Sequence, residues 1–332
     1  MSILLIALTV LMAVGMGWSI GANDAANSMG TAVGARVLTL RQAIVLIAIF
    51  GFLVAFLQGG YVSKTIGKGI IDLSVLPKGD ASLIALTATF ASCLWVVLAT
   101  YWKMPISTSH SIVGAVAGAG LALPGLSTYT QIHWGVLRGI FVCWVLTPAG
   151  AAIIGYVLFL VLQRLYPRIV PERHSRGVLR WLIILSGCYV AYSWGANDVA
   201  NATGILMGAG ILPGRTSVVL GGAAIVLGIV TWGYKVIETI GSGIAHLLPL
   251  MAFSAQLASA INVHVYTVMG VPVSTSHSIV GAIFGIGLVQ GVRVVNLRIL
   301  REIVICWVAT PFISGLLSFI ILKAITWLWA MR

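Results

Sequence analysis

The sequence has few charged residues, and very few of them are negatively charged. Only 8% of its 332 residues are charged, and Asp and Glu together number 7, whereas a soluble globular domain carries about 25% charged residues. Hydrophobic residues make up 60% of the chain, and the mean hydropathy is +1.08. This composition excludes a protein whose main solvent is water and predicts one that is embedded in a membrane.

Cysteine is scarce as well, and no cleavable leader is predicted. The first 20 residues lack a basic start and a small-residue cleavage site, so we interpret them as part of the mature protein. The cysteines lie inside apolar segments without metal-ligand spacing, which indicates buried, inert thiols. These four residues are Cys93, Cys143, Cys188 and Cys306.

What the sequence does have is a series of apolar stretches that approach the ~20 residues needed to cross a bilayer. They lie near residues 3–20, 43–62, 83–102, 134–162 and 181–194, and the second half repeats the pattern. The net charge of +12 comes from basic residues in the short links between them. Membrane topology explains this charge better than nucleic-acid binding does.

The chain contains an internal repeat. GANDAANSMG at Gly21–Gly30 returns as GANDVANATG at Gly195–Gly204, and PISTSHSIVGAVAGAGL at Pro105–Leu121 returns as PVSTSHSIVGAIFGIGL at Pro272–Leu288. We therefore predict a first transmembrane repeat at 1–165, a basic cytoplasmic linker at 166–177 and a second transmembrane repeat at 178–332.

The number of crossings sets the relation between the repeats. With five crossings per half, an odd number, the second copy enters the membrane in the reverse orientation, which is the inverted repeat of many secondary transporters. An outside N-terminus places most Lys and Arg residues in cytoplasmic links, so both termini are predicted outside the cell. A re-entrant segment in each half would change this count.

The Asn-Asp motifs place polar side chains within apolar segments. Ionisable residues there usually face a cavity or an ion path, which makes Asp24 and Asp198 candidate site residues, although helix capping would also use Asn and Asp. Gly21 and Gly195 precede the motifs and predict a break in each helix. Exposed carbonyls and a carboxylate would suit a hard cation such as sodium.

The Ser-Thr-Ser-His segments predict two helix N-termini that are rich in hydroxyl groups. Hydroxyls and free amides at such an end can donate several hydrogen bonds to an oxyanion without a full opposite charge. Ordinary N-capping is the alternative interpretation. His110 and His277 lack a neighbouring metal ligand, so we favour a structural hydrogen-bonding role for both over metal binding or proton transfer.

These doubled motifs, together with the related stretches 65–70 and 239–244, resemble the inorganic phosphate transporter (PiT) family over nearly the whole chain. The resemblance implies an all-α polytopic membrane protein with two inverted-topology repeats and broken or re-entrant helices around a central substrate site. It implies phosphate contacts from Asn23, Asp24, Asn27, Ser107, Thr108, Ser109, Asn197, Asp198, Asn201, Ser274, Thr275 and Ser276. It also suggests a homodimer.

The coupling ion is predicted less directly. Sodium ligands are expected among Asn23, Asp24, Asn197, Asp198 and Glu238. The family often has Glu before the Thr-Ile pair, as Glu238 stands here, but the first copy has Lys64. Lys64 could replace a cation, pair with a carboxylate or extend to the membrane interface, and Glu238 could carry a proton, hold sodium or pair with Lys235.

The predicted function is import of inorganic phosphate by cation symport through alternating access, with sodium favoured over protons, in a plasma membrane. No enzymatic activity, cofactor or nucleic-acid partner is expected. A sulfate or other oxyanion permease of the same fold is the first alternative, although a carboxylate that accepts the proton of phosphate would repel sulfate. A passive channel and a membrane-embedded hydrolase are the others; adjacent Ser109 and His110 do not face each other as nucleophile and base.

Overall fold

The computed structural model describes residues 3–102, 104, 106–123, 132–234, 237, 248–291 and 297–331. Throughout these residues the chain is helical, without a β-strand. Seven of the described helices are long and apolar enough to cross a membrane. The predicted all-α polytopic fold is therefore confirmed.

The first repeat begins with a long helix and ends with another. Its helices are α1 (Ile3–Gly34), α2 (Leu40–Gln58), α3 (Gly60–Lys64), the π-helical turn η1 (Thr65–Gly69), the 3-10 turn η2 (Leu73–Val75), α4 (Lys78–Tyr101), α5 (Thr108–Ala122) and α7 (Trp134–Ile169). The second repeat follows the same order. It contains α8 (Glu172–Gly208), α9 (Gly214–Gly228), the π-helical turn η3 (Ile229–Gly233), α11 (Pro249–Val268), α12 (Thr275–Gln290) and α13 (Leu297–Ala330).

Helices α4 and α5 form a re-entrant hairpin that turns inside the protein. α4 runs alongside α1 in parallel register, because the Ser92 hydroxyl contacts the Met16 sulfur at 3.5 Å and, two turns on, Asn23 Nδ2 donates to Thr100 Oγ1 at 2.8 Å. The chain then reverses, and α5 begins at the buried Thr108, at the level of the Asn-Asp motif of α1.

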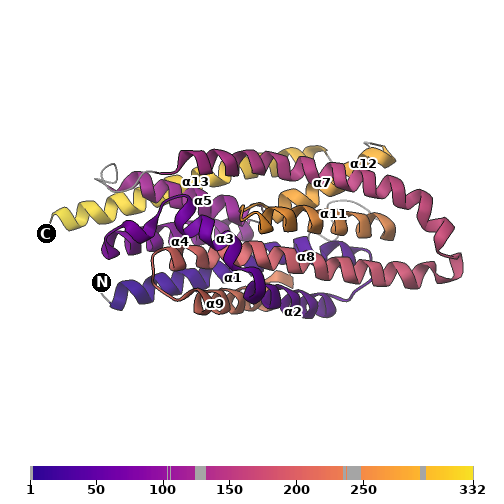
Figure 1. The fold of residues 1–332 in the computed structure, drawn as a ribbon, viewed down its shortest axis with the longest axis horizontal. Helices are drawn as coiled ribbons and strands as arrows, with labels where there is room; N and C mark the ends of the chain where they lie inside the picture. Colours follow the sequence, from indigo (N-terminus) through magenta and orange to yellow (C-terminus); the bar gives the residue numbers. More distant parts are fainter. Residues whose placement is uncertain are drawn as a thin grey trace.

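Helices α11 and α12 form the equivalent hairpin beside α8. Ser186 Oγ donates to Gln256 Oε1 at 2.8 Å near the start of this pair, and Asn197 Nδ2 donates to the Val273 carbonyl at 2.7 Å at its tip. The α4–α5 hairpin lies toward one end of the molecule and the α11–α12 hairpin toward the other (Figure 1). Their tips meet in the middle.

The two repeats are inverted, as predicted, but the count of five crossings per half is wrong. Within the described residues each half has three crossing segments and one re-entrant hairpin, because the helix pairs α4–α5 and α11–α12 turn back at the centre of the protein instead of crossing. Three is also odd, so the inversion is preserved: the end of α1 and the start of α8 lie together, and both chain ends lie at the opposite end of the molecule (Figure 1).

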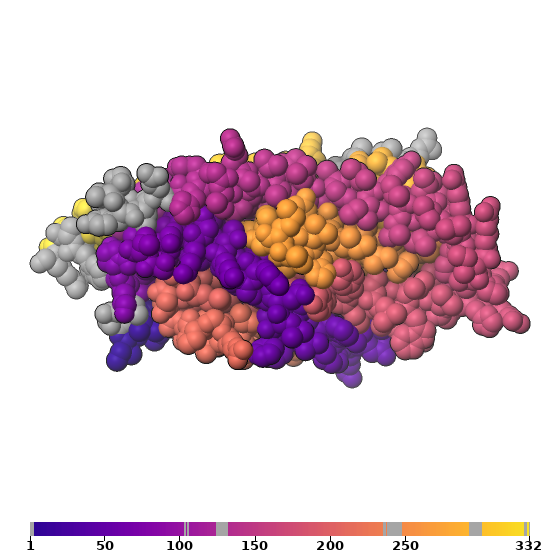
Figure 2. Space-filling model, viewed as in Figure 1, coloured from indigo at the N-terminus to yellow at the C-terminus, as the bar shows by residue number. Residues whose placement is uncertain are grey.

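The repeats interleave. α2 packs against α8, and in the equivalent position α9 packs against α1; α5 packs against α13, and α12 against α7. Segments from the beginning, middle and end of the chain accordingly lie side by side on one face (Figure 2). The core that surrounds the hairpin tips is built by both repeats.

Glycine permits the closest of these contacts. A Cβ atom at Gly118 of α5 would collide with the carbonyl oxygen of Gly315 in α13, and one at Gly285 of α12 would collide with that of Ala152 in α7. Small residues allow membrane helices to approach this closely, where dispersion contacts replace the hydrophobic effect as the source of stability.

Candidate substrate-binding site

The two Asn-Asp motifs lie inside continuous helices. α1 runs without interruption through Asn23 and Asp24, and α8 does the same through Asn197 and Asp198. The predicted helix breaks at Gly21 and Gly195 are therefore wrong. A Cβ at Gly21 would collide with the Ile225 carbonyl of α9, and one at Gly195 with the Gly51 carbonyl of α2, so these glycines allow close helix packing instead.

The interrupted helices are those of the hairpins. Ser107 caps α5 by accepting a hydrogen bond from the His110 amide at 3.2 Å, and Ser274 caps α12 through the His277 amide at the same distance. Each cap occupies the third amide of its helix, while the first two amides of a helix have no intrahelical acceptor. Both hairpins thus direct free N–H groups and a positive dipole end toward the centre.

The structure brings all the predicted phosphate contacts into this central region. Each of the twelve side chains is at most 7% exposed. Asp24 and Asp198 are each 1% exposed, which in an apolar environment requires hydrogen-bonding partners or a bound cation.

Hydrogen bonds across the repeats join the motifs in a symmetric pattern. Asn27 Nδ2 of α1 donates to Ser276 Oγ of α12 at 2.8 Å, and Asn201 Nδ2 of α8 donates to Ser109 Oγ of α5 at 2.9 Å. Each Asn-Asp motif therefore contacts the Ser-Thr-Ser segment of the other repeat. The two copies form one site between the repeats.

Asp24 uses both of its carboxylate oxygens within the protein. Oδ1 accepts from Asn27 at 3.2 Å, and Oδ2 accepts from the Thr108 hydroxyl at 2.8 Å. Thr108 also accepts from Asn201 Nδ2 at 3.4 Å, and Asn201 donates to Asp198 Oδ1 at 3.1 Å. A chain of hydrogen bonds therefore connects the two aspartates.

Asp198 has hydrogen-bond partners at only one of its two carboxylate oxygens in the described structure. Its Oδ1 accepts from Asn197 at 2.7 Å, from Asn201 and, at 3.4 Å, from Ser109. Its Oδ2 and the neighbouring Asn201 Oδ1 are buried and have no hydrogen-bond partner within the described residues. These two oxygen atoms are hard acceptors of the kind that binds an alkali or alkaline-earth cation.

Other predicted positions are placed differently. Asn23 donates to Thr100 in the last turn of α4, a partner that the predicted site did not include. The available signal was Thr267, a threonine at the equivalent position of the second copy. Lys64 is exposed at the end of α3. Glu238 and its neighbour Lys235 lie outside the described residues. No cluster of three His, Cys, Asp or Glu side chains that could bind a metal occurs among the residues described.

The two histidines form a ring stack that sequence patterns did not indicate. His110 stacks on Trp144 and His277 on Trp307, each with centroids 3.6 Å apart, and the two imidazoles meet edge to face at 4.5 Å. Each Nδ1 contacts the backbone carbonyl of the opposite tryptophan, Trp307 for His110 and Trp144 for His277. This geometry supports the structural role and joins the two hairpin tips to α7 and α13.

A buried polar site between inverted repeats, reached by two opposed re-entrant hairpins, is the architecture of a membrane transporter and not of an enzyme. The chain belongs to the phosphate transporter family, whose model matches residues 20–176 and 168–318, one match for each repeat.

Similar proteins extend over the whole chain. A protein of Pyrococcus furiosus predicted to be a phosphate permease is 31% identical, with 97% of this chain and 96% of that protein covered. A chloroplastic inorganic phosphate transporter of Arabidopsis thaliana is 29% identical over 94% of this chain and 70% of its own length. A solved structure described as the sodium-dependent phosphate transporter superposes with a TM-score of 0.87 at 29% identity, covering 99% of this chain and 100% of that one.

Proposed function

We propose that this chain imports inorganic phosphate together with sodium through alternating access around the central site. The observation that carries the proposal is the meeting of two half-helix N-termini and two buried carboxylates in one hydrogen-bonded cluster. The amides and hydroxyls of the hairpins would bind the phosphate oxygens, and a carboxylate would accept the proton that phosphate retains at neutral pH.

The sodium assignment rests on the donor atoms and on a relative. Asp198 Oδ2 and Asn201 Oδ1 are buried oxygen atoms without a partner in the described structure, and the superposed structure is that of a protein described as sodium-dependent. A cation at Asp198 would neutralise its charge beside the anionic substrate. Simultaneous binding of both ions is then favourable, which is the physical basis of symport.

The orientation of the chain follows from its basic residues. The links at the end opposite the chain termini contain Arg36, Arg41, Arg164, Arg168, Arg173, Arg176 and Arg180. By the positive-inside rule that end is cytoplasmic and both termini are outside. We further propose a plasma-membrane location, repeat boundaries at 1–165 and 178–332, and a homodimer.

Transport by purified protein in proteoliposomes tests this function. Radiolabelled phosphate is expected to accumulate against its gradient only with an inward sodium gradient, and excess unlabelled sulfate is expected not to compete. Accumulation driven by a pH gradient alone would assign the coupling to protons. Phosphate uptake that is absent, or abolished by sulfate, would contradict the substrate assignment.

Ser276 is expected to contribute a substrate hydrogen bond. Its oxygen accepts from Asn27, so its proton remains free to donate, whereas the Ser109 hydroxyl donates to the Val273 carbonyl at 2.9 Å. A hydrogen bond to a charged group contributes about 1.5–3 kcal/mol, so Ser276→Ala should raise the KM for phosphate about tenfold or more.

Ser278→Ala is the matched control, because Ser278 lies on the same helix but donates to the Ser259 carbonyl outside the site. Initial uptake rates across a range of phosphate concentrations give both KM values. Equal KM values for the two variants would show that Ser276 does not contact the substrate.

A further inference from the structure

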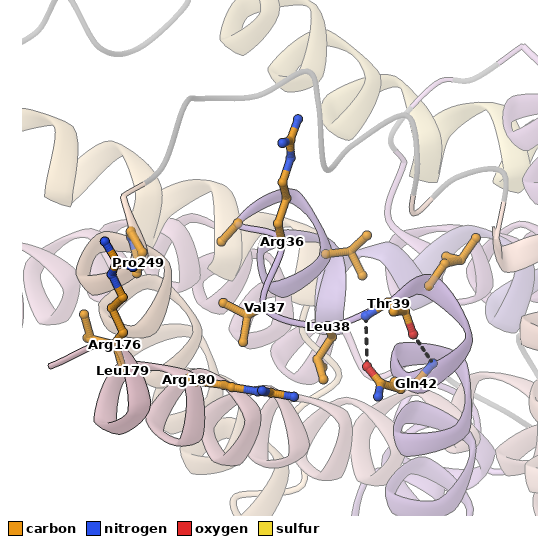
Figure 3. Close-up of a pocket in the computed structure, with 12 residues that line it drawn as sticks. Arg36, Val37, Leu38, Thr39, Gln42, Arg176, Leu179, Arg180 and Pro249 are labelled. Atoms are coloured by element: carbon orange, nitrogen blue, oxygen red, sulfur yellow. Dashed lines mark hydrogen bonds between the residues drawn. The ribbon is translucent and has the colours of Figure 1, made fainter. Parts of the chain in front are cut away.

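A second polar site lies away from the central one. A cavity of about 810 Å³ opens where the end of α1, the start of α2, the first turns of α8 and the start of α11 meet (Figure 3). It shares no residue with the twelve predicted phosphate contacts. Its volume falls within the range of about 300–1,000 Å³ that is typical of small-molecule sites.

The charge around this cavity is of one sign. Arg36 comes from the link between α1 and α2, and Arg176 and Arg180 come from successive turns of α8 (Figure 3). Among the residues that the structure describes, none that lines the cavity is acidic, and Glu172, one turn before Arg176, does not line it. Three arginines line this hollow, and Figure 3 shows their side chains running in different directions from it. A positively charged lining favours an anion, and a planar guanidinium group matches the oxygens of a phosphate group.

The link that presents Arg36 has a defined backbone conformation. Arg36 has φ of 56°, in the left-handed region that residues other than glycine seldom adopt. Just beyond it, the Thr39 amide donates to Gln42 Oε1 at 3.0 Å and the Gln42 amide donates to Thr39 Oγ1 at 3.3 Å (Figure 3). This capping box fixes the start of α2 and so positions the preceding turn.

Apart from the arginines, Thr39 and Gln42, the described lining is apolar. Leu38 is buried, and Val33, Val37 and Leu179 are half-buried. Trp181, which follows Arg180, is 65% exposed, and exposed tryptophans of membrane proteins concentrate at the level of the lipid headgroups. The cavity therefore combines cationic groups with an apolar wall at the depth where phospholipid phosphates lie.

We propose that this cavity binds a phosphate-bearing anion, either the headgroup of an anionic phospholipid or free inorganic phosphate. The apolar wall favours the lipid, whose acyl chains would continue along Val33 and Leu179. A bound anion would hold the end of α1 against the start of α8, the two helices that contain the Asn-Asp motifs. The inference does not depend on the transport proposal, because binding can be measured without transport.

The test compares two triple variants of the full chain. The pocket variant is Arg36→Asn, Arg176→Gln and Arg180→Gln, with asparagine chosen because it tolerates the left-handed conformation. The control variant is Arg41→Gln, Arg168→Gln and Arg173→Gln, which removes the same charge from exposed arginines outside the cavity. The control separates a site from the general attraction between basic residues and an anionic membrane.

Binding is measured in mixed micelles with two probes. In the first assay, dioleoylphosphatidylglycerol is titrated into micelles that contain dioleoylphosphatidylcholine, and the melting temperature of the protein is measured. In the second, the binding of radiolabelled phosphate is measured by equilibrium dialysis in micelles that contain phosphatidylcholine alone. At about 1 kcal/mol for each basic residue, the pocket variant should bind phosphatidylglycerol about 100-fold more weakly than wild type, and the control variant should be unchanged.

The outcomes separate the two sources of the anion. If free phosphate occupies the cavity, phosphatidylglycerol affinity is unchanged and the pocket variant binds one phosphate fewer per chain than wild type. The proposal is overturned if both probes bind the pocket variant as they bind wild type, or if the control variant loses as much binding as the pocket variant. Elution of every variant as a single peak at the wild-type volume in size-exclusion chromatography confirms that the chains are folded.

Discussion

Replacing Asp198 with asparagine is expected to lower sodium-driven phosphate uptake at least about 100-fold, on the basis that a buried contact to a charged group contributes about 3 kcal/mol. Asparagine keeps the shape of the side chain and an acceptor for Asn201, but it removes the charge and replaces one carboxylate oxygen with a donor. The carboxylate oxygen without a described partner, Oδ2, is the atom that we assign to the cation. Initial uptake rates in proteoliposomes measure the effect.

Asp80→Asn serves as the control, because Asp80 lies in the first turn of α4, far along the chain from either motif. Both variants should elute and melt like the wild type, which would separate loss of coupling from loss of folding. An Asp198→Asn variant whose uptake still rises with the sodium gradient as in wild type would rule out Asp198 as a sodium ligand.

Replacing Gly118 with alanine is expected to destabilise the protein by about 3 kcal/mol, the upper range for overpacking a tight core. The added methyl group would collide with the backbone of Gly315, and a backbone cannot move aside as a flexible side chain can. Because α5 is capped by Ser107 and bears Thr108 and Ser109, any displacement of this helix also moves the site. A thermal melt monitored by size-exclusion fluorescence measures the loss.

Gly139→Ala is the matched control, since a Cβ at Gly139 of α7 would have nothing within 4 Å. Gly285→Ala should reproduce the defect, because Gly285 makes the equivalent contact with Ala152 in the other repeat. If Gly118→Ala melted at the same temperature as Gly139→Ala, the close approach of α5 and α13 would not contribute to stability.

Sequence identity between the two copies predicted which residues would lie together, while their contact with phosphate stays a prediction. The motifs around Asp24 and Asp198 repeat because both copies contribute equivalent groups, and the structure places all twelve predicted phosphate contacts in one buried region. Inversion was also predictable from an odd number of crossings. These inferences needed only the order of apolar segments and the recurrence of polar side chains.

Composition could not distinguish a crossing helix from a re-entrant one. α4 is as long and apolar as a spanning helix. The chain nevertheless reverses its direction between Tyr101 and Thr108, inside the protein, and returns as α5. The glycines before the Asn-Asp motifs predicted helix breaks because glycine is a poor helix former. Packing overrode that preference, since only glycine allows α9 to approach Gly21.

Contacts between distant segments were beyond prediction for a different reason. The contact of His110 Nδ1 with the Trp307 carbonyl and the cavity lined by Arg36 and Arg176 join residues that share no motif and no sequence spacing. Such sites depend on how the two repeats dock. A single sequence records the residues of each repeat but not the face with which each meets the other.

The interleaving of the repeats affects how the chain is made. α5 belongs to the first repeat, yet its principal partner, α13, is synthesised only after the other described helices of the second repeat. Until then the face of α5 that contains Gly114 and Gly118 lacks its partner helix, and the polar N-terminus of α5 lies in the bilayer or at its surface. Insertion of the first repeat thus precedes its final packing, and the hairpin tips can reach their final positions only after α13 has been translated.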